Sequence, residues 1–147
     1  MSIERTRPAI VLLAEDNESD FILTKRAFER ARLTLDLHRV SNGERCMAFL
    51  RKEEPFQDAP TPDLILLDLN MPVMDGREVL AELVKDAAFC HLPVVILTTA
   101  SEHLEIKRLY ALRVSSYIRK PVDFDQFVRV IRDLGHYWFT VVVLPSD

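Results

Sequence analysis

Glycine is scarce in this chain, which has 147 residues and only three glycines. Average usage of ~7% would give about ten. A glycine-rich loop that cradles the phosphates of a dinucleotide or a nucleoside triphosphate therefore cannot be built. The two cysteines, Cys46 and Cys90, form no CxxC motif and no cluster with histidine. A disulfide scaffold and a structural zinc site are thus excluded, and both cysteines are expected to be small buried hydrophobic residues.

Positive charge and long hydrophobic runs are also lacking. The chain has 23 acidic and 19 basic residues, which gives a net charge of −4. This balance excludes the cationic field that unaided binding to nucleic acid or to an anionic membrane needs. No apolar run approaches the ~18 residues of a membrane span, and the N-terminus does not have the form of a signal peptide. We expect a cytoplasmic protein that contacts neither nucleic acid nor membrane directly.

Short apolar runs and amphipathic stretches alternate along the rest of the chain. Periodicity predicts strands and helices in strict alternation. The expected strands are Ala9–Ala14, Leu35–Val40, Leu64–Leu67, Pro93–Leu97 and Val114–Ile118, and the expected helices are Ser19–Arg32, Asn42–Lys52, Gly76–Ala87, Glu102–Leu112 and Asp123–Leu134. Apolar strands joined by helices predict an α/β fold with a parallel sheet covered on both faces.

Chemically useful side chains follow the strands at their carboxyl ends, where ligands bind in such folds. Glu15 and Asp16 follow the first strand, Asp68 the third, Thr98 the fourth and Lys120 the fifth. Three carboxylates in one crevice repel one another unless a cation lies among them, and hard oxygen ligands suit Mg²⁺. A carboxylate beside such an ion can act as a nucleophile toward a phosphoryl group. A hydroxyl and a lysine can then take up charge on the transferred oxygens.

Four runs around these positions resemble the motifs of a response-regulator receiver domain. They are LLAEDN at 12–17, LLDLNMPVMDG at 66–76, LPVVILTT at 92–99 and YIRKP at 117–121. The resemblance extends over about Ala9 to Leu134 and implies a flavodoxin-like (CheY-like) doubly wound sheet of five parallel strands with helices on both faces. It also implies that Asp68 is the phosphoacceptor and that a histidine kinase is the partner that phosphorylates it.

The resemblance implies further roles around Asp68. Glu15, Asp16, Asp68 and the backbone carbonyl of Asn70 would hold Mg²⁺, Thr98 and Tyr117 would form the conformational switch, Lys120 would pair with the phosphoryl group, and Pro121 would follow a cis peptide bond. Two positions depart from the family pattern. Thr99 stands where receivers usually carry Ala or Ser, and Arg113 stands where many carry Gly. Neither departure removes a chemical group.

The C-terminal part narrows the resemblance to small regulators paired with phytochrome-type histidine kinases. We expect residues 8–135 to form a stand-alone receiver domain and residues 136–147 to form a C-terminal extension. The extension is more apolar than a solvated terminus should be, which favours a dimerisation arm and a homodimer over an arm folded on its own domain. The candidate arm residues are Tyr137, Trp138, Phe139, Val141, Val143 and Leu144.

Three other functions are compatible with parts of this pattern. A Mg²⁺-dependent phosphohydrolase with an aspartyl nucleophile needs a general acid two residues after the nucleophile, and that position is Asn70. A flavin carrier of this fold needs hydroxyls and glycines in its first loop, where the chain reads EDNESD and would repel a phosphate. A phosphorylation-independent interaction domain has no need of the phosphoryl-handling groups that are present. We therefore expect a signalling protein, not an enzyme.

Overall fold

The computed structural model describes residues 8–98, 116–119 and 124–135, with only the backbone path at Thr98, Ser116–Arg119 and Gly135. From residue 8 to residue 98 the chain alternates between strand and helix, as the periodicity predicts. The strands are β1 (Ala9–Ala14), β2 (Leu35–Val40), β3 (Leu64–Asp68), β4 (Val94–Thr98) and β5 (Ser116–Arg119). The helices are α1 (Glu18–Arg30), α2 (Gly43–Arg51), α3 (Gly76–Lys85) and α5 (Phe124–Gly135).

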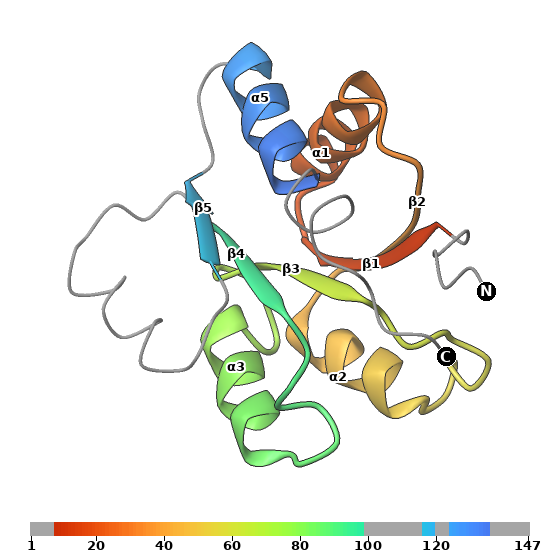
Figure 1. Ribbon diagram of the computed structural model, residues 1–147. Helices are drawn as coiled ribbons and strands as arrows, with labels where there is room; N and C mark the ends of the chain where they lie inside the picture. The colour runs from red at the N-terminus through yellow and green to blue at the C-terminus, as the bar shows by residue number, and fades with distance from the viewer. Residues whose placement is uncertain (1–7, 99–115, 120–123, 136–147) are drawn as a thin grey trace, which may run out of the picture.

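All strand pairs are parallel, and the sheet order is β2-β1-β3-β4-β5. Helices α1 and α5 cover one face of the sheet, and α2 and α3 cover the other (Figure 1). This is the doubly wound flavodoxin-like arrangement that the sequence predicts. The register brings the strand ends to one edge, because Ala14 lies opposite Val40 and Leu67, and Asp68 lies opposite Leu97.

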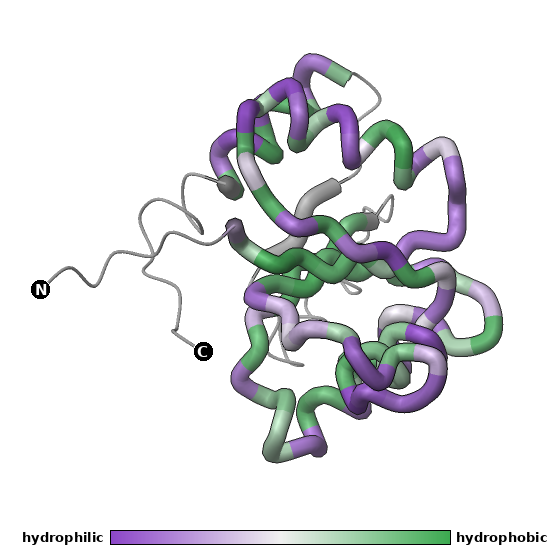
Figure 2. The backbone as a smooth tube through the Cα atoms, turned by 90° about the vertical axis from the view of Figure 1, so that its right-hand side faces the viewer, coloured by the Kyte–Doolittle hydropathy of each residue, from purple (hydrophilic) through white to green (hydrophobic). Residues whose placement is uncertain are grey.

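The central strands are buried because both of their faces are covered. Figure 2 shows them as a largely hydrophobic band between helices in which hydrophobic and hydrophilic residues alternate. Every residue of β3 is buried. In β1, Leu12 and Ala14 face the α2/α3 layer, while Val11 and Leu13 face the α1/α5 layer. Near-continuous apolar sequence is what a strand buried on both faces requires.

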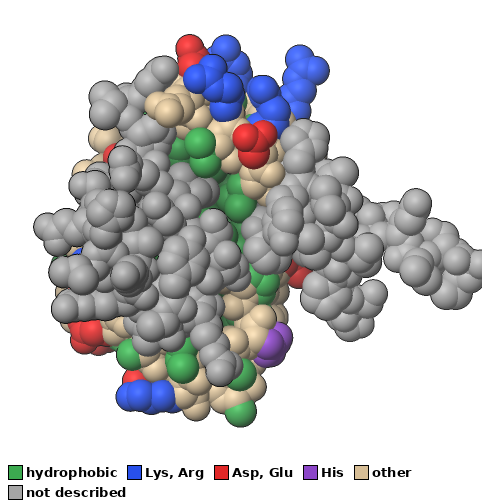
Figure 3. Space-filling view, turned by 60° about the vertical axis from the view of Figure 1, so that its left-hand side comes forward, with side chains coloured by type: hydrophobic (Ala, Val, Ile, Leu, Met, Phe, Trp, Pro, Cys, Tyr) green, Lys and Arg blue, Asp and Glu red, His purple; other side chains and the backbone are tan. Residues whose placement is uncertain are grey.

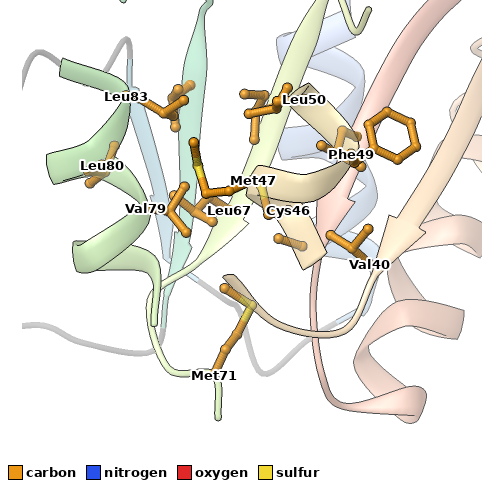
Figure 4. Packing of buried hydrophobic residues seen from close by; sticks show 14 of the residues in the cluster. Val40, Cys46, Met47, Phe49, Leu50, Leu67, Met71, Val79, Leu80 and Leu83 are labelled. Carbon is orange, nitrogen blue, oxygen red and sulfur yellow. The ribbon is translucent and has the colours of Figure 1, made fainter. Parts of the chain in front are cut away.

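Helices α2 and α3 pack on the sheet through the residues that periodicity selects. Met47, Phe49 and Leu50 of α2 are buried. Figure 4 shows Met47 beside Val79 of α3 and Phe49 on the other side of α2, toward Val40. The α2/α3 layer also contains Cys46, where burial raises the pKa of the thiol to about 12. A thiol with this pKa stays protonated and behaves as a small hydrophobic residue. The prediction for Cys46 is confirmed.

Two predictions of burial are wrong. Cys90 is exposed, because it lies in the turn that follows α3, where its backbone N–H donates to the Asp86 carbonyl. The helical periodicity of α1 also predicts that Ile22 lies on its apolar face together with Phe21, Ala27 and Phe28, but Ile22 is 39% exposed. Thr24 is buried on the core side instead and donates its hydroxyl to the Asp20 carbonyl one turn earlier. The hydrogen bond satisfies the hydroxyl inside the helix, so a polar residue can occupy a core position.

Charged residues cover the outward faces of α1 and α5. Lysine and arginine side chains gather at the top of the molecule in Figure 3, the end formed by these two helices. Lys25 and Arg26 of α1 and Arg129 and Arg132 of α5 are exposed. The two helices therefore each pair a polar outer face with an apolar inner face, as helices on the surface of a sheet do.

The loop between β3 and α3 contains a strained residue. Val73 has a φ of 68° and a side chain that is 73% exposed. A β-branched residue in the left-handed region is costly, since its Cβ approaches the carbonyl oxygen, and here little burial offsets the cost. The backbone of this loop is held elsewhere by hydrogen bonds from Gly43 N–H to the Met74 carbonyl (2.8 Å) and from Gly76 N–H to the Leu69 carbonyl (3.0 Å).

Val73→Gly is expected to stabilise the protein. The substitution removes a left-handed penalty of ~1–2 kcal/mol and adds ~0.5–1 kcal/mol of backbone entropy to the unfolded chain, so the net gain is about 0.5–1 kcal/mol. Chemical denaturation measures it. The matched control is Val84→Gly in α3, where the residue is 40% exposed and helical, and the same change should destabilise. Equal losses at both positions would show that Val73 is not strained.

Candidate phosphorylation and metal site

The corner between β1 and α1 carries two acidic residues of the predicted site, Glu15 and Asp16. Glu15 is fully buried, and its backbone N–H donates to the Val40 carbonyl at 3.0 Å. Asp16 is exposed, and the N–H of Asn17 donates to the Glu15 carboxylate at 3.3 Å. The Asn17 side chain accepts from the Asp20 N–H at 2.9 Å and so caps α1. The cap ends the strand and begins the helix within three residues, which leaves both carboxylates at the sheet edge.

Asp68 occupies the carboxyl end of the central strand β3. Its side chain is 5% exposed, and the Asn70 N–H donates to its Oδ1 at 3.2 Å, which orients the carboxylate. The start of α3 lies directly against the backbone of Asp68. A Cβ at Gly76 would lie 2.4 Å from the Asp68 carbonyl oxygen and 2.8 Å from the Leu69 Cα. Both distances are below 3.0 Å, which real Cβ atoms essentially never show to a neighbouring atom. Gly76 is therefore required by this close approach, and not by a positive φ.

Glu15, Asp16 and Asp68 converge. One carboxylate oxygen from each lies within 4.8 Å of the other two. Carboxylates this close repel one another, and a divalent cation among them removes that repulsion. The donor set consists of hard oxygens, and one member is exposed, which suits Mg²⁺ because the ion keeps several waters. The residues present therefore fit the metal that the sequence predicts.

Other predicted site residues fall partly or wholly outside the described residues. The backbone of Thr98 ends β4, opposite Arg119 of β5, and Tyr117 pairs with Ile96 on the same two strands. Lys120 and Pro121 lie outside the described residues. The expected helix Glu102–Leu112 and the expected extension at 136–147 lie outside them as well. The strand pairing places Thr98 at the same edge of the sheet as Asp68, and it places Tyr117 on the strand next to Thr98.

Two residues that shape this site gave no sequence signal of their own. Arg39 was one polar position in an alternating strand, yet its guanidinium donates to the carbonyls of Glu15 and Asp16. Gly76 was one residue of a family motif, and its contact with the Asp68 backbone depends on how α3 returns to the sheet. Each contact joins elements that are separated in the chain, so periodicity could not reveal it.

Comparison with known proteins identifies the family. A family model described as "Response regulator receiver domain" matches residues 11–132. The chain belongs to the response regulator receiver family. Response regulator Rcp1 of Synechocystis sp. is 34% identical to this receiver over 146 residues, which are 99% of each chain. Receivers of this family are phosphorylated by histidine kinases and act as signalling proteins.

Solved structures of similar proteins have the same fold as this receiver. The phosphorylated cyanobacterial phytochrome response regulator RcpA has a TM-score of 0.88 at 36% identity, with 95% of this chain and 100% of that chain covered. Response regulator RPA3017, described in red light signalling of R. palustris, has a TM-score of 0.88 at 36% identity, with 95% and 99% covered. The family and these structures confirm the predicted fold class.

A bound metal is known in one of these relatives. The Mn²⁺-bound form of Rcp1 has a TM-score of 0.86 at 33% identity, with 95% of this chain and 100% of that chain covered. Receivers bind a divalent metal in an acidic pocket, and Glu15, Asp16 and Asp68 form such a cluster here. The cofactor of this receiver is therefore a divalent metal ion, and the hard oxygen donors of the cluster suit Mg²⁺. Among the helices that the structure describes, none is both long and apolar enough to cross a bilayer.

Proposed function

We propose that Asp68 accepts a phosphoryl group from a histidine kinase of the phytochrome type. The observation that carries the proposal is the convergence of Glu15, Asp16 and the buried Asp68 at the carboxyl edge of the sheet. The relatives described as phytochrome or red-light response regulators support the kinase type. We further propose that this receiver is cytoplasmic. We also propose that it is not an enzyme, because the phosphoryl group that it accepts stays on the protein itself.

The chemistry assigned to Asp68 is a nucleophilic substitution at phosphorus. A carboxylate oxygen of Asp68 forms the new O–P bond, the N–P bond of the phosphohistidine breaks, and its electron pair stays on the histidine nitrogen. Bound Mg²⁺ would neutralise charge on the transferred oxygens. The Asn70 N–H holds Oδ1 of Asp68 and so fixes the plane of the attacking carboxylate. Thr98 and Lys120 are assigned to the phosphoryl oxygens, and the Asn70 carbonyl is assigned to the metal.

The conformational response is assigned to Thr98 and Tyr117, which lie on neighbouring strands. A hydroxyl drawn toward the phosphoryl group would vacate space for the aromatic ring. The phosphoryl group then acts as a ligand that favours one of two states of the domain. Pro121 remains the candidate for a cis peptide bond.

The full chain is expected to gain one phosphoryl mass when incubated with acetyl phosphate and Mg²⁺. Removal of the metal with a chelator should slow the labelling at least ~100-fold, since charge on the transferred oxygens would no longer be neutralised. Intact-protein mass spectrometry measures both rates. The chelated sample after readdition of excess Mg²⁺ is the control, and labelling that proceeds equally without metal would contradict the proposed chemistry.

We also propose that the extension at 136–147 builds a homodimer. Its support is the sequence, in which Tyr137, Trp138 and Phe139 precede the apolar Val141, Val143 and Leu144. Large aromatic residues dominate the energetics of interfaces, and the exchange of an arm between two copies is a low-cost route to a dimer.

Deletion of this extension is expected to convert a dimer to a monomer. The full chain should sediment as a dimer at micromolar concentration. A chain that ends at Gly135 should sediment as a monomer, because it lacks the aromatic and apolar residues of the extension. The matched control is Trp138→Ala with Phe139→Ala in the full chain, which should weaken the dimer with the length kept. A full chain that is monomeric with and without phosphorylation would rule out the arm.

A further inference from the structure

Arg39 lies beside the acidic site without contributing a ligand to it. It is the second-last residue of the edge strand β2, opposite Leu13 of β1. From there its side chain extends over the end of β1 to the corner that carries Glu15 and Asp16. Its Nε donates to the Glu15 carbonyl at 3.0 Å, and its Nη2 donates to the Asp16 carbonyl at 3.3 Å.

Two further contacts hold the guanidinium in place. Nη1 forms an ion pair with the Glu18 carboxylate in the first turn of α1. The guanidinium carbon lies 4.7 Å from the centroid of the Phe21 ring, which is a cation–π distance. The Arg39 side chain is only 22% exposed. The guanidinium is planar, and its N–H donors have a fixed geometry. Because Glu18 holds Nη1 and Phe21 covers one face, Nε and Nη2 point toward the two backbone carbonyls.

The atoms that Arg39 holds belong to the backbone of the two acidic residues. The Glu15 N–H donates to the Val40 carbonyl, and the Glu15 carbonyl accepts from Arg39, so both peptide groups of Glu15 are bound by the end of β2. The Asp16 side chain is exposed, so packing does not hold it in place. Where its carboxylate can reach therefore depends on the position of its backbone. Without these bonds the corner could relieve the repulsion among the three carboxylates by turning one of them away.

We propose that Arg39 is a positioning residue for the metal site, one that keeps the Glu15 and Asp16 carboxylates directed at Asp68 by holding their carbonyl groups. The inference rests on the metal site of the proposed function and adds a residue that determines its metal affinity. Groups that orient metal ligands typically change affinity by ~10–100-fold.

A direct electrostatic effect of Arg39 would have the opposite sign. A positive charge near the site repels a cation, so loss of Arg39 would then tighten Mg²⁺ binding. The Glu18 carboxylate sits against the guanidinium and offsets this repulsion. We therefore expect the positioning effect to exceed the repulsion, and the direction of the change in Mg²⁺ affinity distinguishes the two effects.

The experiment is a calorimetric titration of the full chain with MgCl₂ alone, with folding checked by circular dichroism. Arg39→Met should weaken Mg²⁺ binding by about tenfold, because it keeps much of the side-chain volume and loses every donor. Arg39→Lys should weaken it by about threefold or more, since a point charge cannot span both carbonyls. Arg39→Lys also keeps a cation for Glu18, so it serves if Arg39→Met does not fold.

Arg51→Met is the matched control. Arg51 forms ion pairs with Glu82 (3.5 Å) and Asp86 (4.0 Å) between α2 and α3, away from the carbonyls of the acidic corner. This variant should bind Mg²⁺ within about twofold of wild type, since surface ion pairs contribute little. With acetyl phosphate, Arg39→Met should need about tenfold more Mg²⁺ for half-maximal labelling and reach the wild-type rate at saturation.

The outcomes distinguish this inference from the proposed function. If wild type does not bind Mg²⁺, the metal site itself is wrong. If wild type binds and Arg39→Met binds as well or better, only the role of Arg39 is overturned. A lower labelling rate that saturating Mg²⁺ does not restore would also overturn it, since positioning of the metal ligands would then not be what Arg39 contributes.

Discussion

Asp68→Asn is expected to abolish phosphoryl uptake. The amide keeps the shape of the side chain but has no nucleophilic carboxylate oxygen, so the acyl phosphate bond cannot form. Intact-protein mass spectrometry after incubation with acetyl phosphate and Mg²⁺ should show no added phosphoryl mass at times when wild type is fully labelled. A phosphoryl mass on this variant would assign the acceptor to another residue.

The same substitution should raise stability in the absence of metal. Glu15, Asp16 and Asp68 have carboxylate oxygens within 4.8 Å of one another, and loss of one charge removes two repulsive pairs. A gain of ~1 kcal/mol would raise the melting temperature by roughly 2–4 °C in a protein of this size. Added Mg²⁺ should stabilise the variant less than it stabilises wild type.

Asp16→Asn is the matched control for Asp68→Asn. It removes the same charge from the same cluster and leaves the nucleophile in place. Labelling should therefore persist at raised Mg²⁺ concentration, because the cation has lost one formal negative ligand. If both variants lost labelling even at saturating Mg²⁺, the loss could not be attributed to the nucleophile.

Gly76→Ala is expected to destabilise the protein and displace Asp68. The new methyl group would lie 2.4 Å from the Asp68 carbonyl oxygen and 2.8 Å from the Leu69 Cα, and neither backbone atom can move aside as a flexible side chain can. Helix α3 must shift away from β3, which strains the bond from Gly76 N–H to the Leu69 carbonyl. Overpacking of this kind costs ~1–3 kcal/mol, and we expect the upper end, about 3 kcal/mol, with a melting temperature lower by roughly 6–12 °C.

Gly43→Ala separates lost stability from a displaced acceptor. A Cβ at Gly43 would lie 2.4 Å from the Met74 carbonyl oxygen and 2.7 Å from a methyl group of Val79, so the methyl group is equally crowded. The crowding is against the far end of the β3–α3 loop and not against Asp68. At a temperature where both variants are folded, labelling by acetyl phosphate should be slowed in Gly76→Ala and close to wild type in Gly43→Ala. Equal rates would mean that Gly76 supports only the fold.

The sequence predicted the elements better than their ends. Strands β1 and β2 match the predicted ranges, because an apolar run or a clean alternation defines both ends of a strand. Asn42 was assigned to helix α2 but is its cap, since its side chain accepts from the Arg45 N–H at 2.8 Å. Helix α3 ends two residues early, at Lys85, because Asp86 is extended. Strand β5 was predicted to end at Ile118, but it extends to Arg119, opposite Thr98.

The acidic cluster could be predicted because topology alone brings it together. In a parallel sheet the carboxyl ends of neighbouring strands share one edge, so Glu15, Asp16 and Asp68 follow from the positions of β1 and β3. Burial of Glu15 and exposure of Asp16 could not be predicted, since adjacent residues in a loop carry no periodicity. The contacts of Arg39 depend on a side chain from one strand that extends over the end of its neighbour, which a pattern along one chain segment does not contain.

The alternation of side chains along β1, β3 and β4 makes the sheet a partition. Leu64 and Leu66 of β3 belong to the α1/α5 layer, whereas Ile65 and Leu67 belong to the α2/α3 layer. Interiors are close-packed, so a change of volume must be compensated by neighbours within the same layer. Distant sites without shared partners contribute additively to stability. The residues of the two layers can therefore change independently during evolution. One side of the molecule can be remodelled for a new partner while the other side keeps its sequence.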